Sequence, residues 1–173
     1  MLVSVVVPAY NEEERITLAL DEAVDYLDET FGRPCEGKGK AAKGFPGAHK
    51  RALRGCAPPE VSGYEIIVVS DGSRDRTVEV VLEFSMKRGL HDVVRVVQLE
   101  KNRGKGGAVT HGFRHARGEY VLFADADGAS KFSDLGKLME GCEEVADGSH
   151  RGVAVGSRSH LVGSEAVVQV RPP

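Results

Sequence analysis

Two aspartates, Asp125 and Asp127, stand two residues apart at the end of the apolar segment VLFA. In extended backbone, residues i and i+2 point to the same side, so both carboxylates are expected to face one ligand while Ala126 faces the protein. Paired carboxylate oxygens suit Mg²⁺ or Mn²⁺, and Gly128 lets the chain turn beside the ion. The segment predicts a metal site at Asp125 and Asp127, with a solvated turn as the alternative.

A glycine-rich segment, KNRGKGG, precedes a predicted helix and has the residues to bind phosphate. Arg103 and Lys105 supply positive charge, and the backbone amides around Gly104, Gly106 and Gly107 lie where a helix begins. The amino end of a helix is a favourable place for phosphate oxygens. The GxxxxGK[ST] pattern is absent, so the segment is not a Walker A motif.

Three further side chains follow other predicted strands and extend this chemistry. Tyr10 offers a flat face for a base, and Asp71 offers an acceptor for a base or a ribose. Arg158 supplies a second cation for phosphate. Together with the aspartates and the glycine-rich segment, they indicate a metal-bound nucleoside diphosphate.

The elements that must position these residues alternate between strand and helix. Strands are predicted at 2–7, where Pro8 ends the apolar run, and at 64–70, 93–99, 119–124 and 152–157. Helices are predicted at 12–31 and 75–88, from the glycine-rich segment to Gly118, and after Ser133, which can cap the last one. The strands are apolar throughout, which predicts an α/β, three-layer α/β/α sandwich with a mostly parallel, Rossmann-like sheet. In such sheets ligands bind beyond the carboxyl ends of the strands, where the polar residues gather.

Composition excludes several other classes of protein. The 173 residues suit one domain, and a net charge of -3 gives no general attraction to nucleic acid. The three cysteines have no CxxC spacing, which argues against a zinc site or a disulfide framework. No apolar run is long enough to span a bilayer, and the N-terminus lacks the features of a signal peptide. The Gly, Pro and basic residues of 32–63 predict a mobile surface insertion.

His111 and His115 lie four residues apart on a predicted helix, a spacing that zinc ligands use. The HExxH glutamate and an obvious third ligand are missing. A structural or solvent-exposed role is therefore favoured over zinc binding.

Five segments, taken in order, resemble the catalytic domain of glycosyltransferase family 2, which has the GT-A fold. They are VSVVVPAYNEE, YEIIVVSDGSRDRT, KNRGKGGAV, GEYVLFADADGASKF and VGSRSHL. The sequences DADGASKF and KNRGKGGA most resemble the dolichyl-phosphate β-glucosyltransferase branch, with dolichyl-phosphate mannosyltransferases as near relatives. The resemblance covers nearly the whole chain outside 32–63 and the last few residues.

The resemblance implies roles for particular residues. Pro8, Tyr10 and Glu12 would line the nucleotide pocket, and Asp71 would contact the uracil. The nucleotide-sugar-binding set would also include Asn11, Gly72, Asn102, Arg103, Gly104, Lys105 and Gly106. Asp125 and Asp127 would hold the metal on the diphosphate, with Arg158 near the phosphates.

The resemblance also implies an activity and a location. The reaction would transfer glucose from UDP-glucose to dolichyl phosphate with inversion and would require Mg²⁺ or Mn²⁺. It would feed protein N-glycosylation at the cytosolic face of the endoplasmic reticulum membrane, with a cytosolic location as the alternative because the sequence contains no transmembrane segment. No nucleic acid partner is implied, and protein partners are unspecified.

Two departures from the family pattern matter. Ser70 stands where the family usually has the first of two aspartates, and Asp71 retains the second. Relatives continue past the GSRSHL segment and usually carry an N-terminal membrane anchor. We therefore expect a C-terminally truncated chain that represents the donor-binding half.

Three alternatives remain at this stage. The first is a remnant that binds UDP-sugar without transferring it, and the second is a mannosyltransferase-like enzyme. The third is a haloacid-dehalogenase phosphatase, because DADGAS superficially matches DxDG[TS]. That family places its motif after the first strand, whereas here it follows the fourth, and Ala129 replaces the usual Thr or Ser. The sequence favours the glycosyltransferase.

Overall fold

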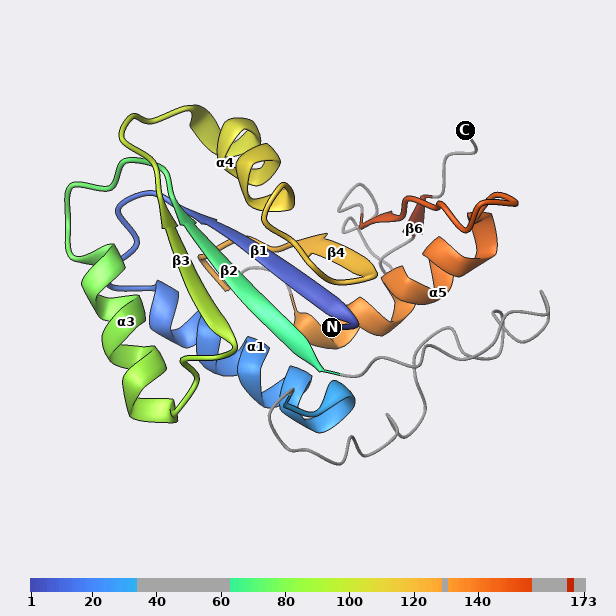
Figure 1. Ribbon diagram of the computed structural model, residues 1–173, viewed down its shortest axis with the longest axis horizontal. Coiled ribbons are helices and arrows are strands. Elements are labelled where there is room, and N and C mark those ends of the chain that lie inside the picture. The colour runs from blue at the N-terminus through green and yellow to red at the C-terminus, as the bar shows by residue number, and fades with distance from the viewer. Residues whose placement is uncertain (34–62, 129–130, 157–167, 170–173) are drawn as a thin grey trace, which may run out of the picture. The chain divides into compact units, whose positions relative to one another are not determined.

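The computed structural model describes residues 1–33, 63–128, 131–156 and 168–169 (Figure 1). The chain divides into two compact units, with the described residues up to Phe132 in the larger and those from Ser133 onward in the smaller. The insertion predicted at 32–63 lies almost entirely outside the described residues. The expectation of a single domain stays a prediction.

The larger unit is built on a four-stranded parallel sheet with the order β3-β2-β1-β4. Its strands are β1 (Val3–Ala9), β2 (Tyr64–Ser70), β3 (Val94–Gln98) and β4 (Tyr120–Phe123). Its helices are α1 (Ile16–Phe31), α3 (Thr77–Arg88) and α4 (Gly104–Phe113). The predicted parallel α/β architecture is confirmed.

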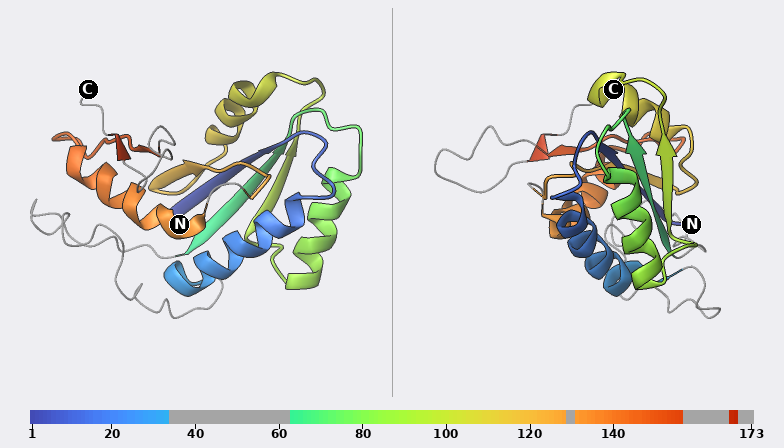
Figure 2. Two further views of the ribbon diagram at one scale, coloured as in Figure 1. Left: turned by 180° about the vertical axis from the view of Figure 1, so that it is seen from behind. Right: turned by 90° about the vertical axis from the view of Figure 1, so that its left-hand side faces the viewer.

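Helices cover both faces of this sheet, as Figures 1 and 2 show, with α1 and α3 side by side on one face and α4 on the other. Strands β1 and β2 are buried almost throughout, which explains their continuous apolar sequence. Under α4, Val6, Ile67, Val69, Leu99 and Ala108 form an apolar core. A methyl group on Gly112 of α4 would lie 2.4 Å from Val6 Cγ1, so this helix packs directly on the sheet.

The first predicted strand was ended too early, because β1 continues through Pro8 to Ala9. Val6 accepts a hydrogen bond from Ala124 in the β4 direction, whereas Ala9 accepts one from Asp71 in the β2 direction. The nitrogen of Pro8 therefore points toward the β4 side, where the β1–β4 ladder has already ended at Val6 and Phe123. Proline costs no ladder hydrogen bond there.

Helix boundaries also differ from the predictions. Helix α1 begins at Ile16 rather than at residue 12, and the amides of Glu12 and Glu13 before it donate to the side chains of Thr77 and Asp75. Helix α4 ends at Phe113 instead of reaching Gly118. Helix α3 ends as predicted, with Gly89 in the left-handed region at φ +65°.

A buried carboxylate, Glu65, fixes the amino end of the sheet. Its Oε1 accepts hydrogen bonds from Ser4 Oγ at 2.7 Å and the Arg117 amide at 2.8 Å. Its Oε2 accepts from Arg117 Nη2 and Arg95 Nη1, both at 2.7 Å. Burial alone would raise the pKa of Glu65, but the bonds from Arg117, Ser4 and Arg95 outweigh it and lower the pKa to about 2. Arg117 lies three residues before β4, so this cluster holds the chain close to the beginning of that strand.

The smaller unit contains α5 (Leu135–Val145), preceded by a single 3₁₀ turn (Phe132–Asp134) that spans the junction. Its strands β5 (Val155–Gly156) and β6 (Val168–Gln169) pair antiparallel. The prediction that 152–157 joins the parallel sheet is therefore wrong. The predicted cap at Ser133 is also wrong, because Asp134 precedes the helix and no side chain caps it.

Candidate functional site

The carboxyl ends of the four parallel strands lie along one edge of the larger unit's sheet. Strand β1 lies between β2 and β4, so the chain progresses to one side through β3 and then crosses to the other side of β1. The ladder between β1 and β4 ends at Val6 and Phe123, after which the two chains separate. Such a reversal of strand order is the usual ligand-binding position in an open parallel sheet.

The loop after β1 is tied to the loop after β2 by Asn11. Its amide donates to Ser73 Oγ at 3.2 Å, and its Oδ1 accepts from the Arg74 amide at 2.9 Å. Asn11 adopts φ +55°, a left-handed conformation that Asn tolerates better than most residues. The exposed Tyr10 and half-buried Pro8 immediately precede this turn.

Glu12 and Glu13 continue the same connection. The Glu12 amide donates to Thr77 Oγ1 at 2.8 Å, and the Glu13 amide donates to Asp75 Oδ2 at 3.1 Å. The Glu12 carboxylate pairs with Arg15 at 2.8 Å. Burial acts to raise the pKa of Asp75, but hydrogen bonds from Thr77 and from the Glu13 amide prevail and lower it. These two loops are thus rigidly joined.

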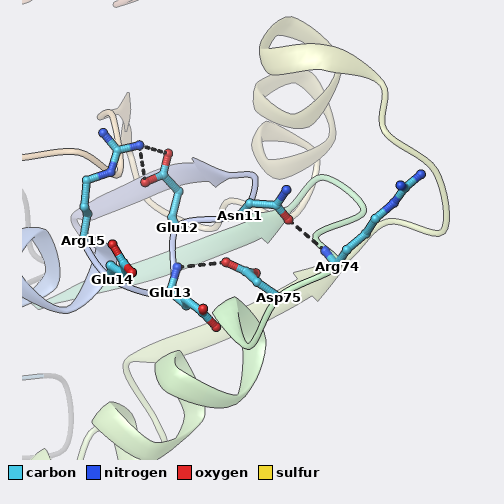
Figure 3. A pocket seen from close by; sticks show the side chains of 7 residues that line it. All are labelled: Asn11, Glu12, Glu13, Glu14, Arg15, Arg74 and Asp75. Atoms are coloured by element: carbon cyan, nitrogen blue, oxygen red, sulfur yellow. Dashed lines mark hydrogen bonds and ion pairs between the residues drawn. The ribbon is translucent and has the colours of Figure 1, made fainter.

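A cavity of about 410 Å³ lies against these two loops (Figure 3). It is lined by Asn11, Glu12, Glu13, Glu14, Arg15, Arg74 and Asp75. Of the predicted site residues that the structure describes, only Asn11 and Glu12 line it. Its polar groups are largely engaged with one another, as the dashed contacts show. The cavity therefore adjoins the predicted site without containing its phosphate- and metal-binding residues.

The loop after β2 is joined in turn to the loop after β3. Asp71 is 3% exposed, and its Oδ1 accepts a hydrogen bond from the Arg103 amide at 2.7 Å. Gly72 has φ +71°, and a Cβ there would lie 3.0 Å from the Asn102 nitrogen. Asp71 thus contacts protein backbone here, and its expected contact with uracil stays a prediction.

The entry to α4 shows which backbone amides are available to a ligand. The first amides of a helix have no carbonyl partner within it. Asp71 binds the Arg103 amide, and Asn102 Oδ1 accepts from the Gly104 amide at 3.0 Å. The amides of Lys105 and Gly106 therefore remain available to an acceptor outside the helix. The positive end of the helix dipole at this terminus favours an anion.

The β3 loop reaches the end of β4 through an ion pair. Lys105 Nζ lies 2.5 Å from Asp125 Oδ1. The same ammonium lies 5.6 Å from the ring centroid of Phe123, a cation–π contact. Contacts therefore link the segment after β1 to that after β2, the segment after β2 to that after β3, and the segment after β3 to that after β4.

The geometry around Asp125 suits a hard divalent cation. Asp125 is partly exposed and Asp127 exposed, whereas the intervening Ala126 is buried. Gly128 turns the chain at φ +70°. The Lys105 ammonium shows that the Asp125 carboxylate already accommodates a positive charge. No group of three or more His, Cys, Asp or Glu that could hold a metal occurs among the described residues. Mg²⁺ commonly binds one or two carboxylates and completes its shell with water and substrate phosphates.

The remaining predictions from the sequence concern Arg158 and the pair of histidines, His111 and His115. Arg158 lies outside the described residues. The Nε2 atoms of His111, in α4, and His115, in the turn that follows it, lie 3.4 Å apart. The role of this pair stays a prediction.

Several residues that organise the site were missed from the sequence. Ser73, Arg74, Asp75 and Thr77 join the first two loops. The Thr77 amide donates to Asp75 Oδ1 at 3.0 Å, a local turn that the spacing D-x-T could have indicated. Phe123 had no comparable signal, because it resembles any other strand residue.

Comparisons with known proteins identify the family of the chain. The family model described as glycosyl transferase family 2 matches residues 49–159. The dolichyl-phosphate beta-glucosyltransferase of Saccharomyces cerevisiae is 37% identical over 98% of this chain and 44% of its own length. That of Drosophila melanogaster is 43% identical over 91% of this chain and 41% of its own length. The chain thus spans about two fifths of these relatives.

A solved structure supports the same assignment. The mannosyltransferase PcManGT from Pyrobaculum calidifontis, in complex with GDP-Man and Mn²⁺, is 25% identical and matches with a TM-score of 0.50. The match covers 84% of this chain and 32% of that one. With a family model that matches more than half of its residues, the chain belongs to glycosyl transferase family 2.

Proposed function

We propose that the linked strand ends form the donor site of a hexosyltransferase and bind a nucleoside diphosphate sugar. The carrying observation is the Lys105–Asp125 pair, which joins the phosphate-binding helix entry to the DxD turn at the reversal of strand order. A diphosphate there would lie between the α4 amides and a metal on the aspartates. The protein groups that bind the base, the phosphates and the metal would then follow one another along the carboxyl-end edge of the sheet.

The individual roles follow from position and chemistry. Asp125 and Asp127 would hold Mg²⁺ or Mn²⁺, which would supply Lewis-acid stabilisation of the charge on the UDP leaving group. The amides of Lys105 and Gly106 would bind phosphate oxygens. The exposed face of Tyr10 would stack on the base.

Asp71 has a positioning role in this scheme. By holding the Arg103 amide it fixes the helix entry that receives the phosphates. Its other carboxylate oxygen remains the candidate acceptor for the uracil. Arg158 remains the proposed second cation near the phosphates.

The proposed reaction is transfer of glucose from UDP-glucose to dolichyl phosphate with inversion, as a step that feeds protein N-glycosylation. The names of the relatives from yeast and fly support the glucosyl group and the dolichyl phosphate acceptor, and UDP as its carrier is part of the proposal. The acceptor phosphate is already an anion, so no strong general base is required. Because the chain spans about two fifths of these relatives, the reaction is proposed for the whole enzyme.

We also propose a location at the cytosolic face of the endoplasmic reticulum membrane, because the names of the relatives indicate dolichyl phosphate, a membrane lipid, as the acceptor. None of the helices in the described part of the chain has the length and apolar character to cross a bilayer. Membrane attachment is therefore tested best by flotation of the expressed chain with dolichol-containing vesicles.

Two assays on the same preparation test the proposal. Calorimetric titration with UDP and with GDP, each with Mn²⁺, should show binding and a preference for UDP. Transfer of radiolabelled glucose from UDP-glucose to a dolichyl phosphate analogue then tests the reaction. Binding of UDP without glucose transfer would restrict this chain to donor binding. Tighter binding of GDP than of UDP would favour a mannosyltransferase-like donor. If neither UDP nor GDP binds, the proposal is refuted.

A further inference from the structure

We propose that Lys105 is a stand-in cation, which neutralises Asp125 in the metal-free protein and moves to the diphosphate when a divalent cation takes its place. The inference rests on the proposed function, because it takes the metal to bind at Asp125. Its direct basis is the 2.5 Å contact between Lys105 Nζ and Asp125 Oδ1. That oxygen cannot bind this ammonium and a divalent cation together without bringing two positive charges into contact.

The position of Lys105 in its helix is electrostatically unfavourable. It lies in the first turn of α4, where the positive end of the helix dipole repels a cation, and that turn contains no acidic residue. Asp125, from the end of β4, supplies the missing negative charge from 20 residues away in the chain. A lysine at this position is therefore held by a long-range partner rather than by its own helix.

The lysine side chain can make the proposed exchange without moving the backbone. Its side chain is 57% exposed, and that of Asp125 is 33% exposed, so solvent reaches both groups. Four rotatable bonds let the ammonium leave Asp125 while Cα stays in the helix. After it leaves Asp125, the ammonium is still close to the helix amides that favour phosphate, so it can pair with the diphosphate of the donor.

The exchange predicts coupling between metal and nucleotide. Without nucleotide, a metal must displace Lys105 and leave its charge close by, which weakens metal binding. With a diphosphate present, the released ammonium gains a new anionic partner. Metal and nucleotide should therefore bind more tightly together than separately, and Lys105 should contribute part of that difference.

Lys105→Met tests this inference, because it keeps the apolar stem beside Phe123 and removes the charge. Mn²⁺ binding without nucleotide would be followed by electron paramagnetic resonance of free Mn²⁺. UDP binding at saturating Mn²⁺ would be followed by calorimetry. Lys87→Met, at the exposed end of α3, removes the same charge away from the site and serves as the control.

The expected changes have opposite signs. Lys105→Met should bind Mn²⁺ alone about fivefold more tightly, which is the scale of a partly exposed ion pair. It should bind UDP with Mn²⁺ roughly tenfold more weakly, because a charge-assisted contact to phosphate is lost. Lys87→Met should leave both affinities at the wild-type values, and a thermal melt should show that both variants fold.

The outcomes separate this inference from the proposed function. If wild-type protein binds UDP with Mn²⁺ but Lys105→Met binds Mn²⁺ alone no more tightly, the stand-in role is wrong and the donor site remains. If wild-type protein binds neither, the proposed function fails and this inference fails with it. A loss of both affinities in folded Lys105→Met would make Lys105 a general support of the site and would overturn the exchange.

Discussion

Replacement of Glu65 by Gln should remove a large, pH-dependent part of the stability of the larger unit. Glu65 is fully buried, and its partners Arg95 and Arg117 are 33% and 55% exposed. Gln keeps the shape and can still accept from Ser4, but its amide group would face guanidinium donors. Removing one partner of a buried ion pair is strongly destabilising, whereas the two arginines can recover some hydration.

The pKa of Glu65 gives the magnitude. It is about 2 in the folded protein against an ordinary value of 4.5. At 1.36 kcal/mol per pH unit, that difference corresponds to roughly 3 kcal/mol. Because the folded pKa is the lower one, the stabilisation is present above about pH 4.5 and is lost as the pH falls toward 2.

Urea denaturation followed by circular dichroism between pH 2 and 7 would measure this difference. We expect Glu65→Gln to be less stable than wild type by roughly 3 kcal/mol near neutral pH, with the gap narrowing below about pH 4. Glu29→Gln, at an exposed position of α1, is the control and should stay within about 0.5 kcal/mol of wild type. This reasoning would be refuted if the loss of unfolding free energy in Glu65→Gln were as small as that in Glu29→Gln, or if it stayed constant down to pH 2.

Two further predictions concern the loops and the core. Asp71→Ala leaves the Arg103 amide without its acceptor, so we expect roughly tenfold weaker UDP binding by calorimetry. Asp71→Asn, which retains an acceptor oxygen, should lose less, and equal losses would count against the positioning role. Gly112→Ala places a methyl group 2.4 Å from Val6 Cγ1, so we expect a loss of about 1–3 kcal/mol in denaturant unfolding. Gly148→Ala, which meets nothing within 4 Å, should be nearly neutral, and similar stability of the two variants would show that α4 does not pack as described.

The parts of the fold that could be predicted depend on local sequence. The apolar run 64–70 forms β2 with the predicted bounds, and Gly89 ends α3 as its conformational freedom indicates. Ala126 is buried between two more exposed aspartates, as the sequence predicts, although the chain turns at Ala126 and Asp127 instead of continuing as an extended strand. These features need no knowledge of the rest of the chain.

The errors come from contacts between distant segments. Pro8 interrupts an apolar pattern, yet the strand continues because its nitrogen faces a side where the ladder has ended. Residues 12–15 have a helical pattern, but this segment is tied to Thr77 and Asp75 through the amides of Glu12 and Glu13, and the helix begins only at Ile16. The segment 152–157 looks like another buried strand, and its described part, β5, pairs with β6 instead. No local pattern contains this information.

The site shows the same division. The residue types at four strand ends could be identified from the sequence, because each follows an apolar run. Their connections, such as Asp71 to the Arg103 amide and Lys105 to Asp125, join residues 32 and 20 positions apart. Only the sheet order brings them together.

Calorimetric titration of UDP with and without Mn²⁺, in wild type and Asp125→Asn, tests the donor site most directly. Wild type should bind UDP at least tenfold more tightly with Mn²⁺, because the metal would join the Asp125 carboxylate to the diphosphate. Asp125→Asn should lose that enhancement, whereas Asp25→Asn, a 70% exposed side chain on α1, should retain it. Equal Mn²⁺ enhancement in Asp125→Asn and wild type would contradict the account.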